Sequence, residues 1–430
     1  MTTTLLQNTL EVTANEFVES VFDFNGVCER KSIRQIFLGI LKSGSTLLNN
    51  IAHTFHPDEW KARKEDRECL SRWLERYSLL ERVQAWMLKS GKEFVHKDTG
   101  IAVDLSDISK PWGGDGMEGM SMGRDGSTHE LKMGHLFGAA AIVPNGTTEA
   151  RPVFVKLQKG RRGEFSLFKN IISTVRTAMD GLGIFIMDRG CDSAEFIWWL
   201  LEEHVTGIVR MRELKRDLFG TGRKINEDFS GIEGKAIQLT SLSGRTISAQ
   251  VKWRIGYLQQ PAPLRKMERI QARQVLVVES SFEEKSLYLV MTLSPEELKN
   301  SRDLDRRAKQ AAQLYLNRWE IELSFLHVKQ NYGLEDARVR TFQRLENLFA
   351  LCYLCHLFMT FHLSTAREYK RIRKIIRDNV VHVEVRAANF LRLIRDLLKV
   401  PKLRYISGRP RINRPSNDGL IQMQLPLFVT

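Results

Sequence analysis

The sequence predicts a mixed α/β protein, because the hydrophobic pattern changes near residue 100. Before about residue 95 the chain is helical in character, with few strand patterns. From residue 101 onward short apolar runs of strand length alternate with helical segments. With 430 residues, 43% of them hydrophobic, the chain has enough apolar material for a large core and for two or three domains.

Residues 1–95 are expected to form a helical first domain. Two helices, over residues 32–41 and 45–55, flank Gly44, and Ser45 is a candidate cap of the second helix. Two helices joined by a short turn are compatible with a helix-turn-helix DNA reader. An ordinary helical hairpin is an equally good interpretation. The local positive charges are Lys31, Arg34 and Lys42.

Residues 96–212 are expected to form the first part of a catalytic core. The predicted strands are residues 101–106, 136–143, 152–157, 183–187 and 207–212, and the predicted helices are residues 165–179 and 193–203. A turn over residues 144–148 joins the second and third strands. This order is compatible with a ribonuclease-H-like core. Active sites of open α/β sheets lie at the carboxyl ends of strands, where Asp188 is expected.

The rest of the chain is expected to contain an insertion, the second part of the core and a basic end. Strands over residues 236–240, 246–253, 273–279 and 288–292 predict a β-rich insertion at 213–295. Residues 296–365 would complete the core, with one helix over 304–330 and an apolar helix over 342–363. Residues 366–430 predict a basic helical region followed by an irregular tail.

Four chemically distinctive residues share the helix predicted over residues 304–330. Tyr315, Arg318, Glu322 and Lys329 are spaced so that an α-helix places them on one narrow face. A carboxylate, two cations and a phenol suit a phosphodiester held beside a metal ion. The alternative is a solvated helix of mixed charge. Glu320 competes with Glu322, and the spacing selects Glu322.

Three carboxylates are candidates for a metal-dependent active site, namely Asp104, Asp188 and Glu322. Phosphodiester chemistry needs an activated nucleophile and a stabilised leaving oxygen, which two divalent cations supply. Mg²⁺ prefers carboxylate oxygens, so a few acidic residues suffice. Asp107 is the alternative to Asp104, because the sequence does not fix the register of the strand.

The charge of the chain predicts a polyanionic partner. There are 65 Lys and Arg residues against 51 Asp and Glu residues, a formal charge of +14, so nucleic acid is the expected partner.

Five cysteines without a disulfide pattern, no export signal and no apolar run long enough for a membrane span predict a cytoplasmic protein. The sequence Cys352-Tyr-Leu-Cys355-His356 fits haem attachment, but its apolar helical setting favours buried structural cysteines. No cysteine and histidine spacing predicts a zinc site.

The spacing Tyr-x2-Arg-x3-Glu-x6-Lys resembles the signature of bacterial insertion-sequence transposases of the insertion-sequence-four family, cut-and-paste enzymes with a DDE triad. Asp104-Leu-Ser resembles the first catalytic motif of the family, and Asp188-Arg189 resembles the second. The resemblance covers residues 95–365. It implies that Asp104, Asp188 and Glu322 are the catalytic metal ligands for two Mg²⁺ ions, with Mn²⁺ expected to substitute.

The resemblance also implies DNA contacts. Tyr315 and Arg318 would hold the phosphate near the transposon end, and Lys329 would contact DNA. Tyr288 takes the place of a tryptophan that stacks on a flipped-out thymine in similar enzymes, although a core tyrosine is the alternative. Arg210, at the end of a predicted strand, is a further candidate DNA contact.

The activity implied is Mg²⁺-dependent cut-and-paste transposition on double-stranded DNA in the bacterial cytoplasm, at the nucleoid. The protein would bind the terminal inverted repeats of its own element and pair two ends in a homodimer. Nicking, hairpin formation and strand transfer would follow. The alternatives are a metal-dependent nuclease of the same fold and an inactive, DNA-binding descendant of a transposase.

Overall fold

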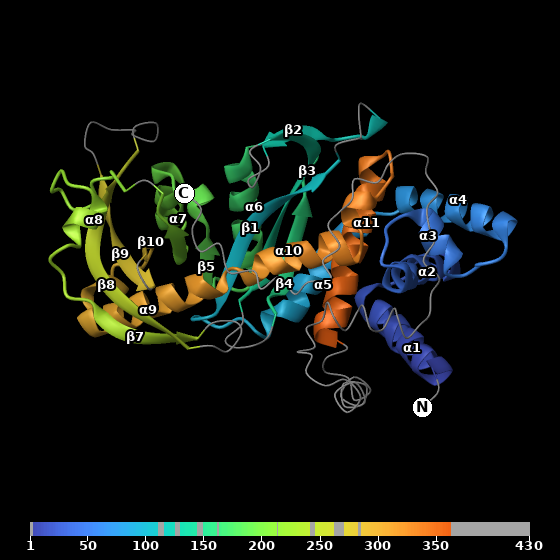
Figure 1. Cartoon of the computed structure of the whole chain (residues 1–430), viewed down its shortest axis with the longest axis horizontal. Helices are drawn as coiled ribbons and strands as arrows, with labels where there is room; N and C mark the ends of the chain where they lie inside the picture. Colours follow the sequence, from blue (N-terminus) through green and yellow to red (C-terminus); the bar gives the residue numbers. More distant parts are fainter. Residues whose placement is uncertain are drawn as a thin grey trace. The chain divides into compact units, whose positions relative to one another are not determined.

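The computed structural model describes residues 3–110, 116–124, 130–143, 149–160, 163–212, 214–240, 246–261, 271–282 and 285–362. All of these lie within one compact unit, Met1–Val400. The turn predicted over residues 144–148 and the basic region predicted over residues 366–430 lie outside the described residues. The described part is a mixed α/β structure, with helices around a central mixed sheet (Figure 1).

The chain begins with helices, as predicted. They are α1 (Thr3–Val21), α2 (Val27–Ser43), α3 (Leu48–His53), α4 (Trp60–Arg76) and α5 (Leu80–Lys92). Helix α2 ends at Gly44, whose φ of 61° is in the left-handed region that glycine favours. The next helix begins at Leu48, so the prediction that Ser45 caps it is wrong. Ser45 Oγ instead accepts hydrogen bonds from the Leu47 N–H and the Asn50 side chain, and so orders the turn.

The strands form one ten-stranded sheet. They are β1 (Gly100–Ser109), β2 (Ser121–Arg124), β3 (Leu131–Ile142), β4 (Arg151–Leu157), β5 (Ile184–Met187), β6 (Gly207–Arg210), β7 (Lys235–Thr240), β8 (Thr246–Gln259), β9 (Ala272–Phe282) and β10 (Lys285–Met291). The sheet order is β2-β3-β1-β5-β6-β10-β9-β8-β7, and β4 pairs with β3. Strands β1, β5 and β6 are parallel, and the other pairs are antiparallel. Strand β2 was not predicted.

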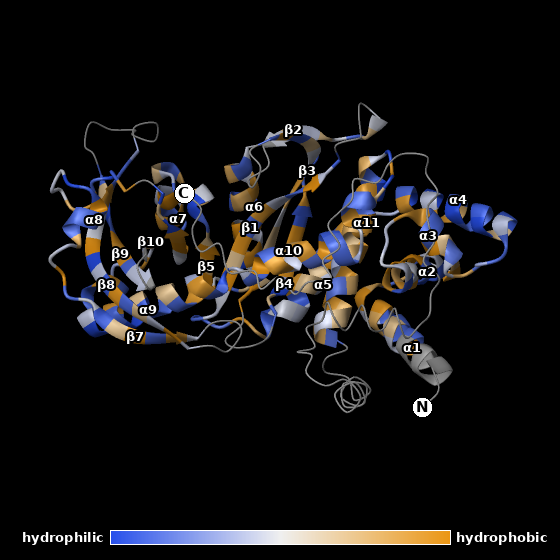
Figure 2. Ribbon diagram, in the orientation of Figure 1, coloured by the Kyte–Doolittle hydropathy of each residue, from blue (hydrophilic) through white to orange (hydrophobic). Residues whose placement is uncertain are grey.

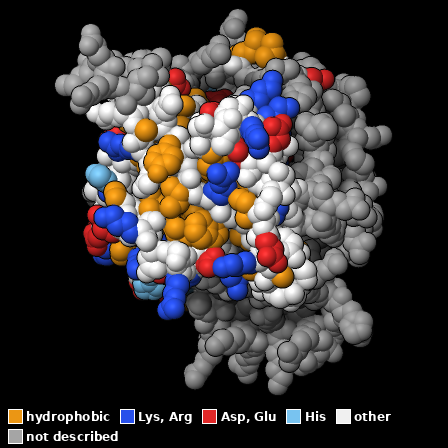
Figure 3. Space-filling view, turned by 90° about the vertical axis from the view of Figure 1, so that its left-hand side faces the viewer, with side chains coloured by type: hydrophobic (Ala, Val, Ile, Leu, Met, Phe, Trp, Pro, Cys, Tyr) orange, Lys and Arg blue, Asp and Glu red, His pale blue; other side chains and the backbone are white. Residues whose placement is uncertain are grey.

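The β-rich segment between Asp188 and Glu322 extends the same sheet. Strand β10 pairs with β6, where Val290 is opposite Val209, and β9, β8 and β7 continue outward. Helix α9 packs on these strands, and Asp305 fastens it by accepting bonds from Trp253 Nε1 at 2.7 Å and Lys235 Nζ at 2.6 Å. The face of the molecule at this end carries apolar side chains at its centre with charged ones around them (Figure 3).

Two helices occur between strands β4 and β6 in chain order. Helix α6 (Glu164–Ala178) packs on β1, β3 and β4. Helix α7 (Ala194–Glu202) begins after Ser193, whose hydroxyl accepts a 3.0 Å hydrogen bond from the Phe196 N–H. The helix predicted over residues 193–203 agrees with α7. Asp188 directly follows β5 and precedes a short 3₁₀ turn, Arg189–Cys191.

The prediction of a single helix over residues 304–330 is wrong, because the structure has two helices in this segment. Helix α9 (Ser301–Asn317) and helix α10 (Glu320–Asn331) are separated at Arg318 and Trp319. The N–H groups of Arg318, Ile321 and Glu322 each bond to the carbonyl three residues earlier, so the backbone tightens locally into a 3₁₀ turn. Glu322 consequently lies in the first turn of α10.

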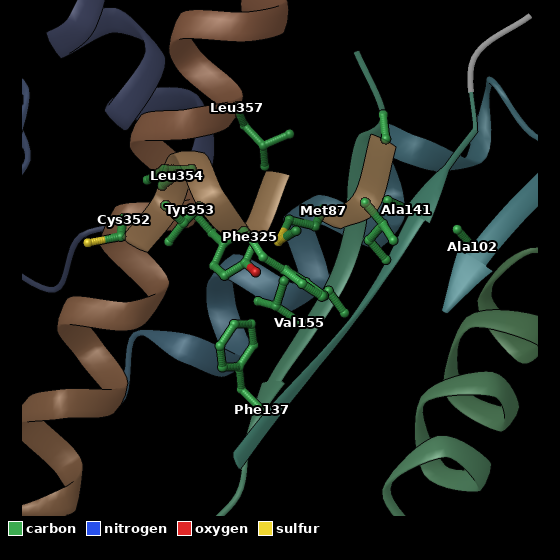
Figure 4. Close-up of a cluster of buried hydrophobic side chains, with 14 of the residues drawn as sticks. Met87, Ala102, Phe137, Ala141, Val155, Phe325, Cys352, Tyr353, Leu354 and Leu357 are labelled. Atoms are coloured by element: carbon green, nitrogen blue, oxygen red, sulfur yellow. The ribbon is translucent and has the colours of Figure 1, made fainter. Parts of the chain in front are cut away.

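Helix α11 (Phe342–Leu357) joins the N-terminal helices to the core. It contacts α2, α4 and α5, and also β4 and α10 (Figure 1). The ring of Phe137 on β3 lies 5.2 Å from Phe325 of α10, 5.3 Å from Phe349 and 6.4 Å from Tyr353 of α11, measured between centroids. Figure 4 shows this cluster. These aromatic contacts hold both helices against the sheet.

The hydropathy of the elements follows this packing. Strands β1, β3 and β5 at the centre of the sheet are largely hydrophobic, whereas α4 is largely hydrophilic (Figure 2). Cys352 and Cys355 are fully buried in α11, as the apolar setting of that segment predicts. Among the helices that the structure describes, none is both long and apolar enough to cross a membrane.

Candidate active site

Two parallel strands carry two of the candidate carboxylates. Strands β1 and β5 pair with Ala102 opposite Ile186, and an aspartate follows two residues later in each segment, within β1 and directly after β5. Asp104 and Asp188 are therefore level on neighbouring strands, on the same face of the sheet. Asp107 lies three residues beyond Asp104 and so points to the opposite face. The strand register favours Asp104 over Asp107 as the partner of Asp188.

Arg318 joins the first carboxylate to the third. Its Nη1 donates to Asp104 Oδ2 at 2.9 Å, and its Nη2 donates to Glu322 Oε1 at 2.7 Å. The side chain of Arg318 is 8% exposed, so both bonds lie in a largely desolvated setting. The planar guanidinium suits this arrangement, because its two terminal amino groups point their N–H donors in fixed directions.

Tyr315 joins the second carboxylate to the same cluster. Its hydroxyl donates to Asp188 Oδ1 at 2.9 Å. Burial raises the pKa of Tyr315, so its hydroxyl stays protonated and remains a donor. Asp104, Asp188 and Glu322 are thus gathered around two residues at the end of α9 and in the turn that follows it.

The three carboxylates have different acidities. Burial, together with the charge of Asp188, raises the pKa of Asp104 despite the opposing charge of Arg318. Burial likewise raises the pKa of Glu322 to about 7. Burial also acts to raise the pKa of Asp188, but Arg318, the backbone N–H of Arg189 and the Tyr315 hydroxyl outweigh it, so this pKa is lowered. Burial is the largest influence on all three pKa values, and for Asp188 the neighbouring cation and hydrogen-bond donors outweigh it.

This donor set fits a divalent metal ion. Two of the carboxylates contact the Arg318 guanidinium and the third contacts the neutral Tyr315 hydroxyl, so these three acidic groups outnumber the one cation that bonds to them. Oxygen ligands of this kind are those that Mg²⁺ prefers. The N-terminus of α10 adds a favourable dipole beside the Glu322 carboxylate.

Arg210 lies near the cluster. It ends β6, and its charge contributes to lowering the pKa of Asp188. Lys329 is placed differently. Its Nζ lies 3.9 Å from Asp107 Oδ1 and 3.8 Å from Glu335 Oε1, beside acidic groups outside the three-carboxylate cluster. The break between α9 and α10 explains why the four signature residues do not share one helical face.

Tyr288 does not fit the predicted stacking role. It is 8% exposed, its hydroxyl donates to Glu279 Oε1 at 3.2 Å, and its ring packs edge-on against Phe229 at 5.9 Å. A ring enclosed in this way has no open face for a base. The geometry corrects that interpretation and favours the alternative of a core tyrosine.

Lys110 is a positioning residue that the sequence pattern did not reveal. It is 6% exposed, and its Nζ donates to the carbonyls of Leu334, Glu335 and Ala337 at 3.2, 2.5 and 2.9 Å. Burial lowers the pKa of Lys110 to about 8. These bonds tie the end of β1 to the segment after α10. A lysine at the end of a strand gives no local sign of such partners.

Comparison with known proteins places the chain in a family. The model of the transposase DDE domain matches residues 132–358, which is more than half of the chain. The matched range contains Asp188, Arg318 and Glu322, and it begins after Asp104. No curated protein matches the chain. The chain therefore belongs to the transposase DDE domain family.

Proposed function

We propose that this chain is a DNA transposase of the insertion-sequence-four type that moves its element by cut-and-paste. It would bind the terminal inverted repeats, pair two ends in a homodimer, nick, pass through hairpin ends and join the 3′-ends to target DNA. The observation that carries the proposal is that Asp104 and Glu322 both bond to Arg318, and Asp188 bonds to the nearby Tyr315, in a member of the transposase DDE domain family.

The proposed catalytic ligands are the three carboxylates. Asp104, Asp188 and Glu322 would hold two Mg²⁺ ions, and Mn²⁺ is expected to substitute because it also accepts oxygen ligands. When bound, the ions would activate the attacking water or 3′-hydroxyl and stabilise the leaving 3′-oxygen. The raised pKa of Glu322, about 7, means that this carboxyl must release a proton before it can bind metal.

The surrounding donors suit the DNA backbone. Arg318 would bind a phosphate through its guanidinium fork. Among the described residues none accepts a hydrogen bond from its buried Nε–H, so that donor remains for a phosphate oxygen. The Tyr315 hydroxyl would donate a hydrogen bond, and Arg210 would add positive charge beside Asp188. Lys329, beside Asp107, would contact DNA farther from the reacting phosphate.

The charge and the domain division complete the proposal. A formal charge of +14 favours a polyanionic partner of the size of duplex DNA. Residues 1–95 would recognise the element end, residues 96–212 and 296–365 would form the catalytic core, residues 213–295 the insertion, and residues 366–430 a basic accessory region. The protein would act in the cytoplasm at the nucleoid.

The proposal is tested on a duplex that carries the element's own terminal repeat, incubated with Mg²⁺ and resolved on a denaturing gel. The wild type is expected to release hairpin-ended DNA. Asp104→Asn and Glu322→Gln should bind the duplex without cutting it, because each removes a metal ligand. Asp107→Asn is the matched control, since it removes a neighbouring carboxylate that points away from the cluster, and it should still cut.

Each other result has a definite meaning. Nicked products without hairpins would replace the proposal with a metal-dependent nuclease. Tight binding without cutting by the wild type would indicate an inactive descendant. If Asp107→Asn loses cleavage and Asp104→Asn keeps it, the assignment of the first carboxylate is wrong.

A further inference from the structure

A second group of metal-ligand side chains lies apart from the three carboxylates. Glu149, His327 and His356 each offer a ligand atom, and these atoms lie within 4.8 Å of one another. His327 Nδ1 is 3.7 Å from Glu149 Oε2, and the two imidazole rings meet edge to face with centroids 5.8 Å apart. The three residues come from the segment before β4, from α10 and from α11.

Thr360 adds a fourth polar group to this cluster. Its hydroxyl lies 3.5 Å from Glu149 Oε2 and 3.4 Å from His356 Nδ1. It belongs to the π-helical turn Phe358–His362 that ends α11, and such turns are frequent at functional sites. In a tetrahedral zinc site with bonds of about 2.0–2.1 Å, neighbouring ligand atoms lie about 3.4 Å apart. The 3.7 Å between His327 Nδ1 and Glu149 Oε2 is near that value, and all three ligand atoms lie within 4.8 Å of one another.

The side chains of the cluster have the chemistry of metal ligands. His356 is 2% exposed, so its imidazole is shielded from bulk water. Imidazole nitrogens are the commonest protein ligands of metal ions. A site with two imidazoles and one carboxylate prefers Zn²⁺ to Mg²⁺, which favours oxygen ligands alone.

The geometry points to a zinc site formed by Glu149, His327 and His356 that clamps α10 to α11 and to the segment before β4. His327 follows Glu322 by five residues on α10, a rotation of about 140° around the helix, so the two sites face different directions. The ion would hold the helix that carries Glu322 without contacting the DNA cleavage site. This inference does not depend on the proposed transposition reaction.

The test is metal binding by the full-length protein after treatment with a chelator. Excess Mg²⁺ is added first to occupy the oxygen-ligand site, and Zn²⁺ is then titrated by calorimetry. Co²⁺ serves as a visible probe, because tetrahedral Co²⁺ with nitrogen ligands absorbs strongly. The wild type is expected to bind one equivalent of Zn²⁺, and its thermal midpoint should rise with Zn²⁺.

Substitutions then locate the site. His327→Gln and Glu149→Gln should weaken Zn²⁺ binding at least about 100-fold, beyond the loss typical of groups that only orient a ligand. His362→Gln is the matched control, since it removes a histidine of the π-helical turn that contains Thr360 but lies outside the cluster. This variant should bind Zn²⁺ as the wild type does. Both test positions are partly exposed, which favours folded variants.

Two results would overturn the inference. One is a wild-type protein that binds no Zn²⁺ in the presence of Mg²⁺. The other is Zn²⁺ binding that survives in both His327→Gln and Glu149→Gln, which would place the ion elsewhere. In either case the three side chains form a hydrogen-bonded cluster without a metal. Cleavage of DNA is measured separately, so failure here leaves the proposed function standing.

Discussion

Arg318 is the residue on which the acidic cluster depends. Its guanidinium spans Asp104 and Glu322, which come from β1 and α10, and it thereby compensates two partly buried negative charges. The burial of Arg318 acts to lower its pKa. The surrounding carboxylates raise the pKa by more than burial lowers it, so the group stays cationic. Removing one partner of such a buried arrangement costs more than the arrangement itself contributes.

Arg318→Met is therefore expected to lower the free energy of unfolding by about 3–5 kcal/mol in metal-free buffer at neutral pH. Urea denaturation measures this loss. Arg318→Lys, which keeps the charge but loses the two-pronged geometry, should lose less. Addition of Mg²⁺ should narrow the difference between Arg318→Met and the wild type. Equal stabilities of Arg318→Met and the wild type without metal would show that Arg318 does not compensate these charges.

Glu322 should make the stability of the metal-free protein depend on pH. Its pKa in the folded state is about 7, above its ordinary 4.5, so the folded state holds the proton more tightly. The stability that this proton contributes is fully present below pH 4.5 and is lost as the pH rises through 7. The wild type should therefore lose stability across this window relative to Glu322→Gln, which has no proton to release there.

The measurement is urea denaturation at a series of pH values in chelator, for the wild type and for Glu322→Gln. The difference between the two stabilities isolates Glu322, because the other titrating groups are common to both proteins. Parallel profiles over the whole window would mean that burial does not raise the pKa of Glu322.

At the scale of elements, the approach of β3 to β1 depends on a glycine. A Cβ atom at Gly134 would lie 2.5 Å from the carbonyl oxygen of Ile108, which is backbone and cannot turn aside. Gly134 pairs with Ser109 of β1 on one side and Ser121 of β2 on the other. Strands β3 and β1 can approach each other this closely only because residue 134 has no side chain.

Gly134→Ala is expected to destabilise the protein by about 1–3 kcal/mol, because the strands must separate to admit the methyl group. Gly123→Ala on β2 is the matched control. A Cβ atom there meets nothing within 4 Å, so its effect should stay within about 0.5 kcal/mol. Chemical denaturation of both variants decides the matter, and equal effects would contradict the close approach.

At the scale of the whole described structure, Asn347 links α11 to the N-terminal helices. It is fully buried, its Oδ1 accepts from the Leu79 N–H at 2.8 Å, and its Nδ2 donates to the carbonyls of Leu74 and Tyr77. One side chain thus satisfies three backbone groups in the connection between α4 and α5. Buried backbone groups that lose a partner are costly.

Asn347→Leu is expected to cost about 3 kcal/mol or more, since each abandoned backbone group costs about 1–3 kcal/mol. Amide hydrogen exchange should also become faster around residues 74–79. Gln343→Leu is the control, because it removes one 3.2 Å bond to the Tyr77 carbonyl from a partly buried position. Unchanged exchange at residues 74–79 in Asn347→Leu would show that this connection is held by other contacts.

The sequence by itself determined the features that repeat over short distances. The alternation of apolar residues located β1, β3, β4 and β5, and Ser193 marked the start of α7. Apolar runs placed Asp104 on a strand and Asp188 at the end of one, and the spacing around Arg318 indicated the transposase family. These features depend on neighbours in the chain, so local pattern is sufficient to find them.

Tertiary structure alone decided how distant segments meet. The register between β1 and β5 distinguishes Asp104 from Asp107, and packing encloses Tyr288. The 3₁₀ turn at Arg318 separates Lys329 from the carboxylate cluster, and the meeting of α10 with α11 brings His327 to His356. Such contacts join side chains that are far apart in the sequence. Core packing and strand register bring them together, and the local hydrophobic pattern does not encode either.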